Sequence, residues 1–427
     1  MTELNARQLL RRFLLITATR WLPVGLLAPV LILLPLHRGL GLAETGTAYA
    51  VQGFVVLALE LPTGGFADSL GRRPVMLVAT MIGTLSYCLF LVADSFWLLV
   101  TFSVLQGLQR SLDSGTLEAW YVDAVHKIDP DARLEGGMSA QGAAVGAGVA
   151  VGAVLSGALV ALDPVPAIGA FVVPVVIGLV FQTLSTVAVV AWMQEHRLAR
   201  VSGLVASVWE TPRAIGDGIA LLRGSRVLLA LLCVELFWGF GMVTFDSLLP
   251  VRLSEVSGGT QTAASITGPA MSAAWAASAV GAATASWFAH RAGTALTAGF
   301  LRVLQGGLVV LLGALGGVPG ILTAYLACYV VHGSSNALHS ALLHRQVGPR
   351  TRATVISLNS MFAQPAGSIG LIVLTGVADQ ISTSAAMFVG GAILAVAAPL
   401  YLPAWRQERA ARTASPEPVV TSRVSAV

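Results

Sequence analysis

Charged side chains are rare in this chain, and several of them stand inside long apolar runs. The 427 residues are 56% hydrophobic and only 11% charged. Arg20, Glu60, Asp113 and Glu235 each interrupt an apolar stretch, where a charge is costly unless it is paired or hydrated. Apolar surroundings favour the protonated form of a carboxyl group. These acids are therefore candidates for loading and releasing a proton.

Histidines form a second group of candidate proton carriers. His332, Asn336 and His339 follow one another at spacings of four and three residues, which places them on one face of a helix. Histidine changes charge near neutral pH, although a hydrogen-bonded structural role is equally compatible with either histidine alone. Glu235 and Asp246 lie on an earlier apolar run. The second part of the chain thus holds both acids and imidazoles that could move a proton.

Aromatic residues accompany these charges. Trp21 follows Arg20, and Trp238 lies three residues after Glu235. Aromatic faces beside a buried carboxylate suit bulky, partly cationic organic molecules, but aromatic side chains also fill cores and line membrane interfaces. The pattern favours a small hydrophobic organic ligand without identifying it.

The apolar runs that carry these residues are long enough to cross a lipid bilayer. Mean hydropathy is +0.79, and a spanning helix needs about 20 apolar residues. The runs are continuous rather than alternating, which favours helices over a closed barrel. We therefore predict an all-α membrane protein with twelve transmembrane helices. Their predicted ranges are 13–36, 46–67, 74–93, 96–120, 137–161, 168–192, 227–249, 268–289, 295–316, 319–343, 353–377 and 383–404.

Arginines lie mostly in alternate loops between the predicted spans. Arg72 and Arg73 stand between the second and third spans and Arg345 between the tenth and eleventh, whereas the intervening loops are nearly free of bases. Loops rich in Lys and Arg stay in the cytoplasm. Both termini are therefore predicted to be cytoplasmic, in a multi-pass protein of the bacterial inner membrane. The same rule accounts for the pI of about 9.2 without a nucleic-acid partner.

Several functional classes find no support in the sequence. Cys88, Cys233 and Cys328 lie in separate apolar runs with no CxxC pair, so no metal or disulfide site is expected. No segment resembles a nucleotide-binding loop. We expect neither a cofactor nor an enzymatic activity.

The predicted spans divide into two sets of six. Residues 1–193 form an N-terminal half and residues 227–404 a C-terminal half. Between them, residues 194–226 combine arginines with apolar residues at helical spacing, which predicts an amphipathic helix along the cytoplasmic interface. Residues 405–427 lack such a pattern and are predicted to be a disordered cytoplasmic tail.

A short polar segment occurs twice in the chain. The segment 288–293 begins with Phe-Ala and ends with Gly, as does the segment 66–71, about 222 residues earlier. Only the earlier copy is followed by a pair of arginines. The repetition indicates two halves built from one pattern.

The first copy carries a recognisable motif. Gly64, Asp68, Gly71, Arg72 and Arg73, between the second and third spans, resemble motif A of the major facilitator superfamily residue by residue. The span number, the loop position and the repeat agree, so the resemblance covers nearly the whole chain. It implies the major facilitator fold, in which two pseudo-symmetric six-helix halves transport a substrate by alternating access. Neighbouring segments resemble a bacterial branch of drug and metabolite exporters.

The motif implies a cytoplasmic gate. Asp68 can accept hydrogen bonds from N–H groups at the start of a neighbouring helix. Arg72 and Arg73 can pair with Glu118 and Asp123 at the foot of the fourth span. Such contacts would hold the cytoplasmic side shut, whereas the alternative is a solvated loop whose arginines only set the topology.

The resemblance also indicates which charges share a cavity, because spans one, four, seven and ten line it in this superfamily. Arg20 and Asp113 lie at similar depth on spans one and four, so we predict that they pair. Arg110 lies one turn outward from Asp113, and Glu60 on span two is a competing partner for Arg20.

These features predict a monomeric secondary transporter. Proton-driven export of a hydrophobic organic compound, such as a drug, an antibiotic or a secondary metabolite, is the preferred interpretation, with Glu235 or Asp113 carrying the proton. Ser69 stands where the motif usually has a base, which leaves proton-coupled import or lipid transport open. A non-transporting membrane sensor or scaffold is the alternative from another class.

Overall fold

The structure is a computed structural model that describes residues 5–64, 70–194, 216, 220–348 and 352–414. The predicted gate residue Asp68 and most of the predicted linker, with its amphipathic helix, lie outside the described residues. Within the described part, every regular element is a helix.

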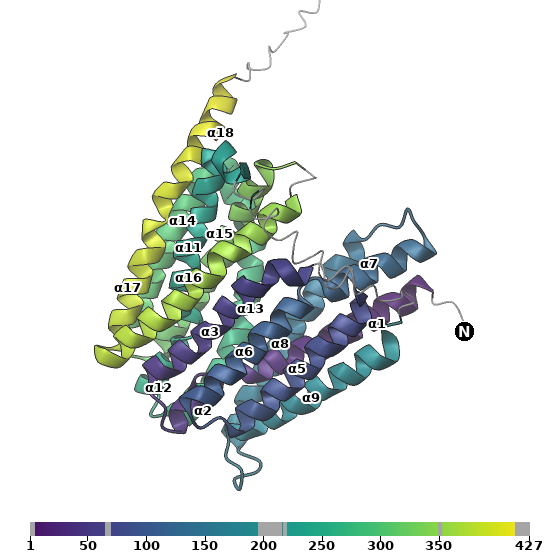
Figure 1. The fold of residues 1–427 in the computed structure, drawn as a ribbon. Helices are drawn as coiled ribbons and strands as arrows, with labels where there is room; N and C mark the ends of the chain where they lie inside the picture. Colours follow the sequence, from purple (N-terminus) through teal and green to yellow (C-terminus); the bar gives the residue numbers. More distant parts are fainter. Residues whose placement is uncertain (1–4, 65–69, 195–215, 217–219, 349–351, 415–427) are drawn as a thin grey trace, which may run out of the picture.

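Two helical bundles lie side by side, and each comes from one half of the chain (Figure 1). The first bundle contains α1 (Ala6–Leu27), α2 (Leu33–His37), α3 (Leu42–Gly64), α5 (Arg72–Val92), α6 (Phe96–Asp113), α7 (Thr116–Ile128), α8 (Glu135–Leu162) and α9 (Val172–Trp192). The second contains α11 (Arg226–Asp246), α12 (Leu249–Val256), α13 (Thr260–Ala292), α14 (Thr294–Ala314), α15 (Val318–Arg345), α16 (Arg352–Gln380), α17 (Thr383–Val396), the 3₁₀ turn η1 (Ala398–Tyr401) and α18 (Leu402–Ala414).

The twelve predicted spans correspond to these helices, with corrections at their ends. The tail that was expected to be disordered from residue 405 is helical through Ala414, because α18 packs on the second bundle. Gly115, with φ of 70°, interrupts the fourth predicted span. Four predicted spans are divided between elements: 13–36 between α1 and α2, 96–120 between α6 and α7, 227–249 between α11 and α12, and 383–404 among α17, η1 and α18.

Hydropathy separates the spans into two groups. Eight segments of the described chain, centred on α3, α5, α8, α9, α11, α14, α16 and α17, are long and apolar enough to cross a membrane by length and composition alone. The spans of lower hydropathy are α1, α6, α13 and α15. Three of these are the first, fourth and tenth spans, where the sequence places many of its charged and imidazole side chains.

The internal repeat is visible in the backbone. Gly71 precedes α5 with φ of 96° and ψ of 152°, and Gly293 precedes α14 with φ of 95° and ψ of 149°. Glycine adopts positive φ at no steric cost, so both copies of the polar segment end in the same turn. The turn thus belongs to the fold, while the charges around it differ between the halves.

The two bundles are joined most closely at one end. The pairs α3 with α16 and α8 with α13 contact each other across the halves. One apolar core cluster includes residues of both halves, among them Leu27 and Leu249, whereas near the termini each half has a cluster of its own. Gly268 shows the close approach, since a Cβ there would lie 2.2 Å from the carbonyl oxygen of Ala153. The tight end is the one remote from the two termini (Figure 1).

Candidate functional site

Arg20 and Asp113 form an ion pair between α1 and α6. Their side chains are 9% and 20% exposed, respectively, so protein covers most of the pair while water still reaches it. Asp113 Oδ1 is buried and has no hydrogen-bond partner within the described residues. The pair therefore combines strong electrostatic attraction with an acceptor atom that is left open.

A break in the fourth span brings a second acid to this arginine. Asp113 is the last residue of α6, and Glu118 lies in the first turn of α7. On an unbroken helix, residues five positions apart point about 140° away from each other. The break at Gly115 redirects the chain, so that both carboxylates interact electrostatically with Arg20. Gln141 Nε2 of α8 also donates a hydrogen bond to Glu118.

Glu60, the competing partner considered for Arg20, has other partners in the structure. Ser360 Oγ of α16 donates to Glu60 Oε2 at 3.3 Å. Glu60 also interacts electrostatically with Arg110. The Glu60–Ser360 hydrogen bond joins the two halves, so this acid belongs to the interface between the bundles.

One of the ion pairs predicted for the gate forms, between Arg72 and Asp123. Arg72 Nε donates to Asp123 Oδ2 at 3.1 Å, with side chains that are 16% and 48% exposed. Arg73 Nη2 donates to the backbone oxygen of Val190 at 2.8 Å, at the end of α9. Glu118, the second predicted acid of the gate, instead accepts from Gln141 and interacts electrostatically with Arg20. The contact thus ties the start of α5 to α7 within the first half.

The second half contains a buried polar cluster, which we call the Glu235 cluster (Glu235, Arg302, Gln305, His339 and Tyr401). Glu235 Oε1 lies 3.0 Å from His339 Nε2, with side chains 4% and 1% exposed. His339 Nδ1 lies 3.0 Å from the Tyr401 hydroxyl. Arg302 is fully buried, interacts electrostatically with Glu235, and donates to Gln305 Oε1 at 3.1 Å. Four elements, α11, α14, α15 and η1, supply these side chains.

His332 lies beside the Glu235 cluster in an aromatic environment. Its ring stacks on Trp238 with centroids 5.8 Å apart, and Trp238 Nε1 donates to His332 Nδ1 at 3.4 Å. Phe245 and Tyr329 complete the surroundings, with centroids 5.8 and 5.7 Å from the imidazole. Gln305 Nε2 of the Glu235 cluster lies 3.5 Å from the same Nδ1, so the aromatic group and the cluster are in contact.

The remaining predicted residues lie at other positions. Asn336 and Asp246 are exposed, so the predicted helical face of α15 divides into a buried His339 and an exposed amide. Asp246 interacts electrostatically with Tyr329, near the aromatic group around His332. Trp21 packs toward Gly148 of α8, where an added Cβ would lie 3.3 Å from the Trp21 Cβ.

Comparison with known families decides the class of the protein. Residues 13–370 match the family described as the Major Facilitator Superfamily. The chain belongs to this superfamily. It is therefore a transporter embedded in a membrane by many spans, and its halves correspond to the two six-helix bundles of that fold.

Three known proteins that are similar to this chain share between 13% and 28% sequence identity with it. The uncharacterized MFS-type transporter YxaM of Bacillus subtilis (strain 168) is 28% identical over 104 residues, which is 24% of this chain and 26% of the relative. The match thus spans about a quarter of that relative's length. A crystal structure of a mutant of the nucleoside transporter NupG has a TM-score of 0.77 at 13% identity, covering 92% of this chain and 99% of that chain. A bacterial homologue of the human lysosomal transporter Spinster gives 0.72 at 14% identity, covering 93% and 96%. These likenesses show the fold.

Sequence reasoning missed two contributions to the polar sites of this transporter. Tyr401 closes the Glu235 cluster from beyond α17, and no pattern singles it out from the other aromatic residues. The redirection of Glu118 toward Arg20 has a local signal, because the Ser-Gly pair at 114–115 is a turn dipeptide. Such a pair inside an apolar run marks a possible break.

Proposed function

We propose that this superfamily member is a monomeric, proton-driven exporter of a hydrophobic organic compound. The observation that carries the proposal is the Arg20–Asp113 pair, with Glu118 as a second acid facing the same arginine. A structural pair has no need of a second carboxylate. Two acids that compete for one arginine form a switch whose position depends on protonation.

The proton step follows from charge balance. Ionised Asp113, at the end of α6, attracts Arg20 of α1. A proton on Asp113 removes that attraction, and Arg20 then interacts more strongly with Glu118 on α7. Because Asp113 ends α6 and Glu118 lies in the first turn of α7, the exchange moves the attraction of α1 from one helix to the other. We propose that this change within the first half is coupled to the rocking of the two halves.

The aromatic group around His332 supports the substrate class. Trp238, Phe245 and Tyr329 surround an imidazole, and exposed Asp246 lies close to Tyr329. Aromatic faces beside an accessible carboxylate favour a bulky apolar compound that carries a positive charge. The Arg72–Asp123 contact lies within the first half, so we propose that it positions α5 against α7, and that closure of the cytoplasmic side needs Asp68 as well.

The test uses purified protein in vesicles that contain a trapped pH indicator. Under an imposed pH gradient, a panel of hydrophobic cationic compounds is added, and proton movement is compared with that in empty vesicles. We expect at least one compound to accelerate proton flux in wild-type vesicles and not in vesicles with Asp113→Asn. Asp131→Asn, in the loop before α8, is the matched control that keeps wild-type flux.

The outcomes separate the alternatives. Compound-driven flux whose direction follows the proton would indicate import rather than export. Movement of a fluorescent phospholipid in place of the compounds would indicate lipid transport. If no compound moves faster than in empty vesicles, the sensor or scaffold class replaces the proposed function.

A further inference from the structure

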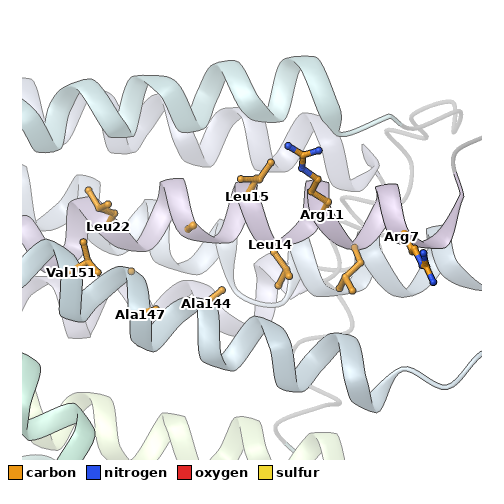
Figure 2. A pocket seen from close by; sticks show the side chains of 11 residues that line it. Arg7, Arg11, Leu14, Leu15, Leu22, Ala144, Ala147 and Val151 are labelled. Carbon is orange, nitrogen blue, oxygen red and sulfur yellow. The ribbon is translucent and has the colours of Figure 1, made fainter.

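A long apolar groove runs between α1 and α8 on the outside of the first bundle. Its volume is about 620 Å³. Figure 2 shows the groove with Leu22 and Val151 toward one end and Arg7 at the other. Its lining residues are Arg7, Leu10, Arg11, Leu14, Leu15, Ala18 and Leu22 of α1 with Ala144, Ala147, Gly148 and Val151 of α8.

The groove exists because α1 and α8 pack tightly over only part of their length. A Cβ at Gly25 would lie 2.2 Å from the carbonyl oxygen of Val149, and one at Gly152 would lie 2.3 Å from that of Leu22. Nearer the N-terminus of α1, the small side chains of Ala144 and Ala147 leave space that the α1 leucines do not fill. The apolar wall is therefore open to the surroundings of the bundle.

Two arginines stand at the N-terminal end of the groove. Arg7 and Arg11 are one helical turn apart, and both are exposed (Figure 2). Neither has a hydrogen bond or an ion pair within the described residues. Arg12, by contrast, turns toward α9 and donates to the backbone oxygen of Trp192 at 3.5 Å. The charges left without a partner are thus the two that border the groove.

We propose that this groove binds one anionic phospholipid, with an acyl chain along the apolar wall and the phosphate held by Arg7 and Arg11. The charge is complementary, because arginine pairs well with phosphate oxygens and basic pockets between spans take anionic headgroups. The dimensions also fit. Leu10 and Leu22 are about 18 Å apart along the helix axis, and one leaflet contributes roughly 15 Å of hydrocarbon.

The groove lies along a helix that also contributes to the polar site of the first half. The same helix, α1, carries Arg20, which lies between Leu15 and Leu22 in sequence on a different face from the groove. A lipid wedged between α1 and α8 would stabilise their separation near the N-terminus. The proposal itself concerns binding only, and it stands whether or not the chain exports a compound.

The test measures lipid retention and thermal stability of the purified full chain. Native mass spectrometry after exchange into phosphatidylglycerol or phosphatidylcholine reports bound lipid. We expect phosphatidylglycerol to be retained by the wild type and about 30-fold more weakly by the Arg7→Gln/Arg11→Gln double variant, since each arginine near a membrane surface contributes to anionic lipid binding. Arg133→Gln, an exposed arginine between α7 and α8, is the matched control with unchanged retention.

A second variant keeps the arginines and fills the groove. Ala147→Phe is expected to lower retention of phosphatidylglycerol while its unfolding temperature in phosphatidylcholine stays near that of the wild type, which shows that the chain folds. Equal retention of phosphatidylglycerol and phosphatidylcholine by the wild type overturns the proposal. So does full retention in the double variant, or in Ala147→Phe. Loss of retention in Arg133→Gln as well would indicate general attraction to the membrane surface and also overturns it.

Discussion

The two halves of this transporter hold their charges in opposite ways. In the first half, Arg20 and Asp113 are 9% and 20% exposed, and Glu118 offers a second acid to the same arginine. In the second half, Glu235 and His339 are 4% and 1% exposed and belong to a cluster with little access to water.

The difference in exposure distinguishes a site that can change its protonation state from a site with a structural role. A partly hydrated pair can gain or lose a proton and change partner at modest cost. A buried cluster is desolvated on every side, so removal of one member leaves an uncompensated charge. The first half is therefore suited to coupling and the second to fixing the arrangement of α11, α14 and α15. Substitutions in both halves test this contrast.

The largest effect on the free energy of unfolding is expected when a buried arginine is replaced by methionine. The same substitution is made in the Glu235 cluster and in the Arg20–Asp113 pair. Arg302→Met leaves Glu235 without its buried cation, and we expect a loss of about 3–5 kcal/mol in the free energy of unfolding. Arg20→Met should cost less, because water can solvate Asp113. Unfolding of both variants in the same detergent, followed by tryptophan fluorescence, gives the comparison. Equal losses would remove the distinction between the halves.

The second prediction concerns transport. Asp113→Asn should reduce proton-coupled flux by roughly 5- to 150-fold, the usual range of a coupling free energy between two ligands, while exchange of substrate across the vesicle membrane without net proton movement continues. Glu235→Gln should instead lower the unfolding temperature more than it lowers flux per folded molecule. If Glu235→Gln abolishes coupling in stably folded protein, the proton carrier lies in the second half.

The sequence predicts those features of the fold and of the polar sites that depend on short segments, and it does not predict those that need several distant elements to meet. The fold follows from apolar run length and from the glycine that ends both polar repeats, since each is a property of a short segment. The Arg20–Asp113 contact follows from equal depth on two spans. The Glu235 cluster needs four elements to meet, and the position of Tyr401 depends on a 3₁₀ turn after α17. No short-range pattern encodes that meeting.

Contacts with distant elements also explain why the chain after residue 405 is helical where disorder was predicted. The polar composition after residue 405 predicts disorder, yet Glu408 accepts from Arg345 Nη1 at 2.8 Å and from the backbone N–H of Ala295 at 3.1 Å. Ala295 lies in the first turn of α14, where backbone N–H groups lack helical partners. The contacts that order α18 thus come from helices more than 60 residues away in the chain.

The third prediction breaks that contact. Glu408→Ala removes both an ion pair and the acceptor at the start of α14. We expect the free energy of unfolding to fall by about 1–2 kcal/mol, similar to the loss of a helix cap. Glu408→Gln keeps an acceptor and should lose less. Limited proteolysis after Arg409 or Arg412 should accelerate in Glu408→Ala, because α18 would detach. Unchanged cleavage rates in both variants would show that other contacts hold α18.

The smallest effect is expected at the corresponding contact of the first half. Arg72 and Asp123 are 16% and 48% exposed, and exposed ion pairs contribute about 0.2–1 kcal/mol. A double-mutant cycle with Arg72→Ala and Asp123→Ala should therefore give a coupling energy of unfolding within this range, well below the cost of Arg302→Met. In the proposed function the gate needs a weak contact, because it breaks in each transport cycle, whereas Glu408 holds α18 by two hydrogen bonds. A coupling energy above about 1 kcal/mol would contradict this proposal, because a strongly held Arg72–Asp123 pair would oppose opening.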